Sequence, residues 1–281
     1  MRSTKMSDLK TATWRLIKSA PAKGAWNMAV DEAILESAGA GLALPTLRLY
    51  AWEPACISLG YAQDFSEIDL EILRAKGWDI VRRTTGGRAI LHTDELTYSV
   101  TAPETEPRLA GGILASYQRL SSAILTALET MELAVQAMPR ELVEKGPQTQ
   151  PVCFEIPSNY EITINGKKLV GSAQARKKGG VLQHGTLPLS GDLRRITEVL
   201  KFENQAARTR AGERLLGRAS TVETALGRAV SWAQAAEAFE TGFAATLNLK
   251  LEPGKLTDRE LSRAEELAEI KYGKLDWTEN R

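Results

Sequence analysis

The chain has 281 residues, of which 43% are hydrophobic, so it can bury an ordinary core and wholesale disorder is not expected. Its 36 basic and 35 acidic residues leave a formal net charge of +1, which gives no general indication of nucleic-acid binding. Two cysteines do not make a disulfide framework, the first residues are polar, and no run approaches the roughly 18 apolar residues of a membrane span. We therefore expect a reduced, cytoplasmic protein that binds neither nucleic acid nor membrane.

The first part of the chain alternates short strands with two helices. Met28, Ile34 and Leu35 recur near helical spacing, which predicts a helix from Gly24 to the stop signals at Gly39 and Gly41. Asp31 and Glu32 are expected early in this helix, where its dipole favours carboxylates. A second helix is predicted at 65–75. Alternating or β-rich patterns predict strands at 14–17, 46–52, 56–60, 78–83, 89–91 and 96–100.

The second part contains the longest helical pattern, at 111–132, and then a polar connection at 139–151. A hairpin follows, and further helices are predicted at 192–200, 221–226, 231–247 and 256–270. Strand patterns dominate from 46 to 189 and helices dominate after it. This mixture without strict β-α-β alternation favours an α+β domain with a largely antiparallel sheet, completed by a small helical end-piece from about residue 190.

A pair of glycines between two predicted strands is the first candidate for chemistry. Adjacent glycines let the backbone approach a ligand and expose its N–H groups, and nearby arginines suit an anionic or carbonyl-bearing ligand. The pattern is neither a Walker loop nor a dinucleotide fingerprint. An ordinary hairpin turn explains it equally well. The residues of interest are Arg82, Arg83, Thr85, Gly86, Gly87, Arg88 and His92.

A second candidate is the lysine pair after the hairpin signal Asn165-Gly166. Because side chains alternate along a strand, Lys167 and Lys168 point to opposite faces, so one of them could enter a site. Taken alone, two solvated lysines are the better explanation.

The cysteines and histidines are also candidates. Cys56 lies in an apolar strand, which indicates an inert buried thiol, whereas Cys153 lies between a polar loop and a hairpin, where a thiol can be reached. His92 and His184 lie at strand ends and are more often structural than catalytic. These residues lack the close pairs of structural zinc sites, so we predict no metal.

Three stretches together resemble the signature stretches of the biotin/lipoate protein ligase superfamily, in the same order. They are 82–92, 166–174 and 182–188, and the helix at 27–33 is similar as well. The resemblance covers roughly 14–247. It implies an α+β fold with a mixed, mostly antiparallel sheet flanked by helices. It also implies a catalytic domain at 14–247 and a C-terminal helical tail at 248–281 that packs on or trails this domain.

Within the superfamily, Cys153-Phe154 followed by Pro157-Ser158-x-Tyr160-Glu161 resembles octanoyltransferases of the LipM type. The closing Lys271-Tyr-Gly-x-x-x-Trp stretch is similar too. This resemblance implies transfer of octanoyl from acyl carrier protein, through a thioester on Cys153, to a lysine of a lipoyl-domain protein. Such acceptors include the glycine cleavage H protein and 2-oxoacid dehydrogenase E2 subunits. No cofactor is implied, and we expect a monomer.

The resemblance also implies roles for individual residues. Cys153 is the expected nucleophile, and Lys168, 15 positions later, is its expected charge partner. The remaining substrate-binding candidates follow the hairpin: Gly171, Ser172, Ala173, Gln174, His184 and Gly185. Two alternatives stay open. One is an ATP-dependent lipoate-protein ligase or an octanoyl/lipoyl amidotransferase, and the other is a catalytically silent binding module, against which the intact motifs speak.

Overall fold

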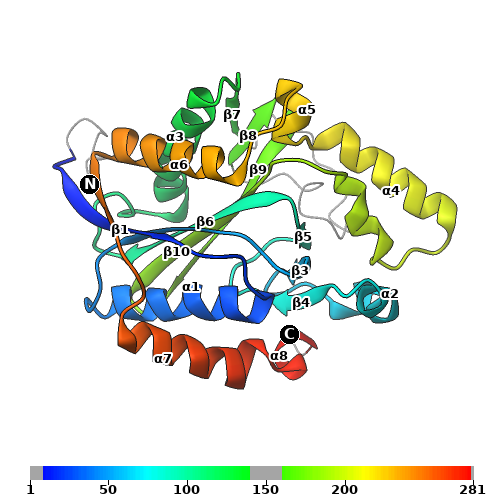
Figure 1. Cartoon of the computed structure of the whole chain (residues 1–281), viewed down its shortest axis with the longest axis horizontal. Coiled ribbons are helices and arrows are strands. Elements are labelled where there is room, and N and C mark those ends of the chain that lie inside the picture. The colour runs from blue at the N-terminus through cyan, green and yellow to red at the C-terminus, as the bar shows by residue number, and fades with distance from the viewer. Residues whose placement is uncertain (1–8, 140–159, 280–281) are drawn as a thin grey trace.

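The computed structural model describes residues 9–139 and 160–279, and within them an eight-stranded sheet is the central element (Figure 1). Its strand order is β11-β1-β2-β6-β10-β9-β8-β7. β1 pairs in parallel with both β11 and β2, and every other neighbouring pair in this sheet is antiparallel. The mixed, mostly antiparallel sheet predicted from the sequence is confirmed. The strands are β1 (Ala12–Lys18), β2 (Thr46–Tyr50), β6 (Glu95–Pro103), β7 (Gln136–Pro139), β8 (Tyr160–Ile164), β9 (Lys167–Lys177), β10 (Gly180–Pro188) and β11 (Leu249–Pro253).

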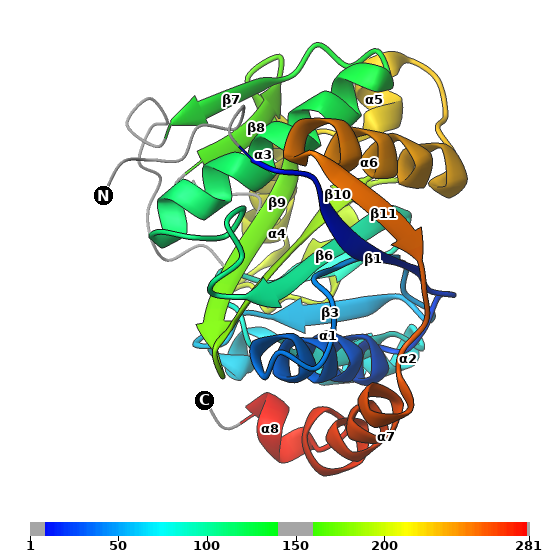
Figure 2. The same ribbon diagram turned by 90° about the vertical axis from the view of Figure 1, so that its left-hand side faces the viewer.

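Helices cover both faces of this sheet (Figures 1 and 2). α3 (Ile113–Thr130) and α6 (Trp232–Leu247) lie together on one face and share a buried apolar cluster with the strands. α1 (Gly24–Gly39) covers the other face, and its buried residues form a second cluster. α6 begins with a capping box in which Ser231 and Gln234 satisfy each other's backbone N–H groups. α1 and α3 follow the apolar spacing read from the sequence, and α6 lies within the helix predicted at 231–247.

A smaller sheet of order β4-β3-β5 lies beside the large one. Its strands are β3 (Cys56–Leu59), β4 (Asp79–Arg82) and β5 (Ile90–His92), and the helices α2 (Leu70–Ala75) and α4 (Gln205–Arg218) belong to this part of the fold. Cys56 is fully buried, and burial raises the pKa of its thiol well above the usual value. The prediction that the thiol at this position is buried is confirmed.

The last part of the described chain is tied to the first. β11 adds a parallel edge strand beside β1, and α7 (Asp258–Leu267) packs on α1. The Arg15 guanidinium holds both carboxylate oxygens of Glu260, at 2.6 and 2.7 Å, in a buried bidentate pair. A short π-helical turn (Ala268–Tyr272) then leads to α8 (Leu275–Glu279). The C-terminal segment is therefore part of the sheet as well as of the helical layer.

Several local expectations differ from the structure, among them the helix predicted at 65–75, which is the 3-10 turn Phe65–Glu67 followed by α2. β11 was not predicted, so the segment after about residue 190 is not purely helical. α4 was also missed, because its sequence is rich in arginine and few of its side chains are buried, although Asn204 does cap it. The helix expected at 192–200 is instead the 3-10 segment Leu193–Glu198, and the short α5 (Val222–Leu226) follows α4. In the described part of the chain, no helix has the length and apolar character to cross a membrane.

Candidate active site

A cavity of about 830 Å³ opens where the two sheets meet the start of α3. Twelve of the residues singled out in the sequence line it: Arg83, Gly86, Gly87, Arg88, His92, Lys168, Gly171, Ser172, Ala173, Gln174, His184 and Gly185. Apolar and aromatic side chains complete the lining, among them Met28, Trp52 and Tyr117. The three sequence stretches that lie far apart in the chain therefore converge on one space, which has room for an apolar tail and a polar head.

Lys168 lies near the start of β9 and its side chain is buried, with 3% of its surface exposed. Its Nζ lies 3.0 Å from Oε1 of Glu161 on the neighbouring strand β8. Lys167 points elsewhere, and its Nζ donates a 2.6 Å hydrogen bond to the carbonyl of Leu216 in α4. Strand alternation thus brings one lysine of the pair to the cavity. Cys153 lies outside the described residues.

The glycine loop after β4 is held from inside by Arg83. Its guanidinium donates hydrogen bonds to the carbonyl oxygens of Ser58, Gly86 and Arg88, at 2.8 to 2.9 Å. The loop also lies against the residue after β3, because a Cβ on Gly60 would stand 1.8 Å from the carbonyl oxygen of Gly87. Only glycine at position 60 permits this approach, so Arg83 shapes the loop while Gly60 leaves it room.

Arg82 does not line the cavity. Its guanidinium is buried and donates to the carbonyl oxygens of Gly60 and Gln63 at 2.8 and 2.7 Å, and to that of Thr278 in α8 at 2.6 and 2.9 Å. The structure therefore gives Arg82 a role in tying α8 to the loop after β3, in place of the substrate contact predicted from the sequence.

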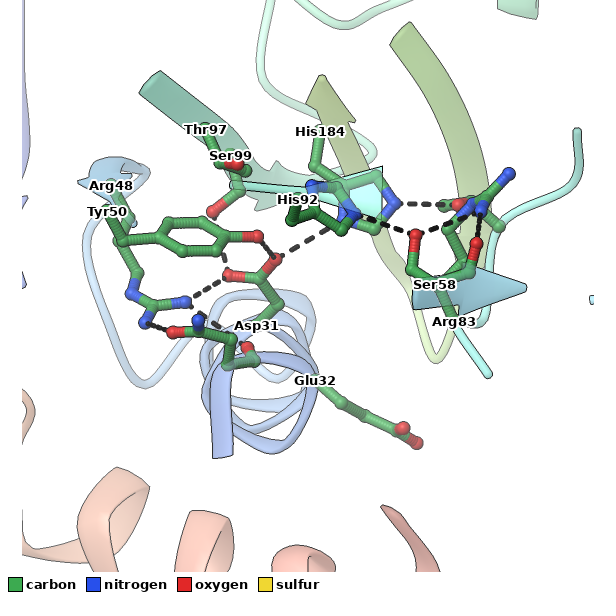
Figure 3. Close-up of polar contacts among 12 residues, drawn as sticks. Asp31, Glu32, Arg48, Tyr50, Ser58, Arg83, His92, Thr97, Ser99 and His184 are labelled. Atoms are coloured by element: carbon green, nitrogen blue, oxygen red, sulfur yellow. Dashed lines mark hydrogen bonds and ion pairs between the residues drawn. The ribbon is translucent and has the colours of Figure 1, made fainter. Parts of the chain in front are cut away.

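His92 lies at the cavity wall between Glu95, Ser58 and Trp52, and Figure 3 shows its contact with Ser58. Its Nδ1 lies 2.6 Å from Glu95 Oε1, and its Nε2 lies 2.7 Å from Ser58 Oγ. The ring stacks on Trp52 with a centroid distance of 4.0 Å, and the Trp52 indole N–H donates to Thr97 Oγ1 at 2.8 Å. The stacking contact and the hydrogen bonds together fix the orientation of the His92 and Trp52 rings in this wall of the cavity.

His184 has a similar arrangement from different elements (Figure 3). Its Nε2 lies 2.6 Å from Oγ1 of Thr85, which is buried behind the glycine loop, and its Nδ1 lies 3.3 Å from Oδ2 of Asp31. Burial lowers the pKa of His184, although the Asp31 carboxylate opposes this shift. The imidazole is therefore neutral at neutral pH, and it joins the glycine loop to α1.

Asp31 is the centre of a buried polar network. The Arg48 guanidinium donates to Oδ1 at 2.8 Å, as does the Ser99 hydroxyl at 2.9 Å, and the Tyr50 hydroxyl donates to Oδ2 at 2.9 Å. Burial alone would raise the pKa of Asp31, but the His184 hydrogen bond and the Arg48 charge outweigh it, so this pKa is lowered. Asp31 stays ionised and anchors His184.

Sequence reasoning missed the network around the two histidines. Asp31 lies in the middle of α1, so the expected dipole contribution at a helix start does not apply to it. Ser58 and Glu95 gave no signal, because neither residue stands in an unusual local pattern. The one available indication of this network was Asp31, a charged residue among the apolar positions of α1.

The two strands behind the cavity approach each other closely at Gly185. A Cβ at this position would lie 2.5 Å from the Gly171 carbonyl oxygen and 2.5 Å from Ser172 Oγ. Ser172 Oγ also lies 2.7 Å from the Tyr98 hydroxyl. The backbone of β9 around Ser172 and Ala173 is thereby held at the cavity wall.

Comparisons with known proteins identify relatives over nearly the full chain. The family model of the lipoyl protein ligase A/B catalytic domain matches residues 23–244. A protein named octanoyltransferase LipM from Symbiobacterium thermophilum is 41% identical, and the alignment covers 94% of this chain and 97% of that protein. One of the same name from Moorella thermoacetica is 43% identical, with coverage of 96% and 98%.

Solved structures with the same fold include lipoate ligases. A bipartite lipoate protein ligase from Thermoplasma acidophilum, described with its E2 lipoyl domain, superimposes with a TM-score of 0.78 and 26% identity, covering 96% of each chain. A lipoate-protein ligase A bound with ATP gives a TM-score of 0.76 and 27% identity, covering 95% of this chain and 99% of that one.

Proposed function

Because the chain belongs to the lipoyl protein ligase A/B catalytic-domain family, we propose that it is an octanoyltransferase of lipoate biosynthesis. It moves octanoyl from acyl carrier protein to a lysine of a lipoyl-domain protein. The observation that carries the proposal within this fold is the buried Lys168 ammonium in the wall of the cavity. A buried cation beside an apolar space suits a thiolate and a thioester better than it suits a structural core.

The reaction has two steps, with Cys153 as the proposed nucleophile. In the first, the Cys153 thiolate attacks the thioester carbonyl of the donor, the bond to the donor sulfur breaks, and the donor leaves as a thiol after taking a proton. In the second, the acceptor lysine amine attacks the octanoyl-Cys153 thioester. The cysteine sulfur leaves, the amine loses a proton, and an amide remains. Because one thioester replaces another in the first step, no ATP is required.

Lys168 supports the first step through its charge. An unperturbed thiol has a pKa of about 8.5 and is mostly protonated at neutral pH, whereas a nearby cation favours the thiolate. Glu161 holds the Lys168 side chain in place, so its ammonium has a fixed position in the wall. We propose that this ammonium stabilises the Cys153 thiolate before the attack on the donor.

The cavity offers groups for the rest of the donor. Gly86 and Gly87 line the cavity, as do Ser172 and Ala173, and their backbone N–H groups are candidates to stabilise the carbonyl oxygen when it gains negative charge. Met28 and other apolar side chains of the lining suit the octanoyl tail. This proposal includes acyl carrier protein as the donor and a lipoyl domain as the acceptor. It also includes action as a monomer and a cytoplasmic location.

The experiment is an intact-mass measurement after incubation with octanoyl-acyl carrier protein in the absence of ATP. We expect an octanoyl adduct that hydroxylamine removes, that is lost in Cys153→Ser and that persists in Cys56→Ala, the matched control at the other cysteine. No adduct in the wild-type protein, together with ATP-dependent modification of a lipoyl domain, would identify a ligase instead.

A further inference from the structure

The outer end of the cavity carries a lysine that the reaction described above does not use. Lys177 is the last residue of β9; it is exposed and it lines the cavity. Its ammonium lies 4.5 Å from the centroid of the Tyr61 ring, a cation–π contact that restrains the side chain. Among residues 9–139 and 160–279, Lys177 has no carboxylate oxygen within the 4.0 Å of an ion pair.

The next residue provides a contrast. Lys178 has a positive φ of 55°, which turns the chain, and its side chain runs to α1. There its ammonium pairs with Glu32 at 3.2 Å and also with Glu36. Lys178 does not line the cavity. The two adjacent lysines thus differ, because Lys178 pairs with two carboxylates, whereas Lys177 lies at the opening with no carboxylate partner among the described residues.

Three basic side chains that lie near Lys177 or line the same cavity are each paired with a carboxylate. Lys271 lies near it, and the pKa of Lys271 is lowered, first by burial and further by the charges of Lys178 and Lys177, although Glu32 opposes the shift. Arg88 lines the same cavity from the glycine loop, with its guanidinium 3.5 Å from Glu67. The end of β9 lies beside the C-terminal helix in Figure 2, and Tyr61 contacts Trp277 of that helix at a centroid distance of 6.3 Å.

The two lysines of the cavity stand near opposite ends of one strand. Lys168 and Lys177 are nine positions apart on β9, which corresponds to about 30 Å along an extended chain. A ligand that reaches both must be extended. It must also keep any charged group at the outer end, because a charge is costly to bury and Lys177 is accessible to water.

We propose that Lys177 binds the phosphate group of a phosphopantetheine thioester while the acyl end of the donor lies near Lys168. This inference rests on the proposed function and identifies how the donor arm is recognised. The phosphate is the one anion of such an arm, and it lies at the end remote from the thioester. Lys177 meets it in water at the opening, so no buried charge is created and the rest of the uncharged arm enters the cavity.

The test compares two small donors that differ only in this group, octanoyl-pantetheine and octanoyl-4′-phosphopantetheine. Rates of adduct formation are measured for the wild-type protein, Lys177→Gln and the adjacent control Lys178→Gln, which removes the same charge outside the cavity. We expect Lys177→Gln to lower kcat/KM for the phosphorylated donor by roughly threefold to tenfold, the range of an accessible charge-assisted contact. Its kcat/KM for octanoyl-pantetheine stays unchanged, and Lys178→Gln affects neither donor.

The preference of the wild-type protein for the phosphorylated donor is also expected to shrink at high salt, because the contact is exposed. Equal losses for both donors in Lys177→Gln would overturn the inference. So would a loss confined to octanoyl-acyl carrier protein, because it would assign Lys177 to the surface of the carrier protein.

A binding measurement separates this inference from the reaction itself. Calorimetry with 4′-phosphopantetheine and with pantetheine, neither of which carries an acyl group, is expected to give tighter binding of the phosphorylated compound, and Lys177→Gln is expected to abolish the difference. Equal binding of the two compounds by the wild-type protein would contradict the phosphate site even if the octanoyl adduct forms. A phosphate preference without any adduct would instead contradict the acyl transfer.

Discussion

The Lys168 ammonium lies 3.0 Å from the Glu161 carboxylate; both side chains are buried, and Lys168 lines the cavity. The two residues stand on neighbouring strands, so the pair joins β8 to β9 as well as fixing the charge of Lys168 in space. A buried ion pair of this kind adds little net stability compared with an apolar pair of the same size, but removal of one partner leaves a buried charge without compensation. The main effect of the ion pair is to fix the position of the Lys168 ammonium in the cavity wall.

Glu161→Gln is therefore expected to damage both folding and chemistry. The change removes the Glu161 carboxylate from a buried ion pair, which should lower the free energy of unfolding by about 3 kcal/mol. Misplacement of the ammonium should slow octanoyl adduct formation by about tenfold or more. Chemical denaturation and time-resolved intact mass measure the two effects. Glu203→Gln, which removes an exposed carboxylate, serves as control, and wild-type adduct rates in Glu161→Gln would contradict a positioning role.

Lys168→Ala tests the role of the charge through pH. Without the ammonium, the reactive thiol loses its stabilised thiolate, so adduct formation should be slow near neutral pH. At higher pH the thiol ionises unaided, and the rate should recover in part. Adduct rates are measured across the pH range, with circular dichroism to verify folding. A constant ratio to the wild-type rate at every pH would remove Lys168 from this role.

Gly60→Ala tests the close approach behind the glycine loop. The added Cβ would meet the Gly87 carbonyl at 1.8 Å, a backbone atom that cannot rotate away. We expect a stability loss of at least about 2 kcal/mol and slower adduct formation, because the loop must move. Gly217→Ala in α4 is the control, since no atom lies within 4 Å of its added Cβ. Its stability should rise by about 0.5–1 kcal/mol. Equal stability of the two variants would contradict the packing described here.

Acidification should weaken the fold through His184. Burial holds the pKa of His184 below its ordinary value of 6.5 in the folded protein, whereas the unfolded chain takes up a proton near that value. The unfolded state therefore binds more protons as the pH falls through 6.5, and the free energy of unfolding decreases, while above 6.5 this contribution is fully present. Denaturation of the wild type and of His184→Gln between about pH 7 and pH 5 measures it. The variant should show the smaller slope, and identical slopes would exclude His184 as the source.

Local patterns predicted much of the fold. The helices α1 and α3 follow from apolar spacing, and the hairpin at Asn165-Gly166 follows from two residues that accept a positive φ, here 51° and 74°. The parallel pairing of β1 with β2 and β11 could not be predicted, because it joins strands by contacts remote in the sequence. The polar helix α4 was missed because helical periodicity is weak where few side chains are buried.

The candidate site divides in the same way. The glycine loop and Lys168 stood in recognisable stretches, and the cavity brings them together. The residues that orient the site could not be predicted, because their contacts are remote in the sequence. Asp31 contacts His184 across 153 positions, and Arg82 donates to the carbonyl of Thr278, 196 positions away. Local sequence reports which groups could react, whereas the groups that orient them are set by tertiary contacts.

The pairing of β1 with β11 has a consequence for how the protein is made. During synthesis β1 is made early, and β2, which follows it, can pair with one edge of β1. The other edge of β1 has no partner until β11, the last strand of the described chain, has been made. Arg15 also lacks its ion-pair partner at this stage, because Glu260 is made after β11. During synthesis the nascent chain thus presents an open strand edge, a template for pairing with other chains. We therefore expect the protein to depend on chaperones during synthesis, and to aggregate when the C-terminal segment is removed, because β1 obtains its second neighbouring strand only from β11.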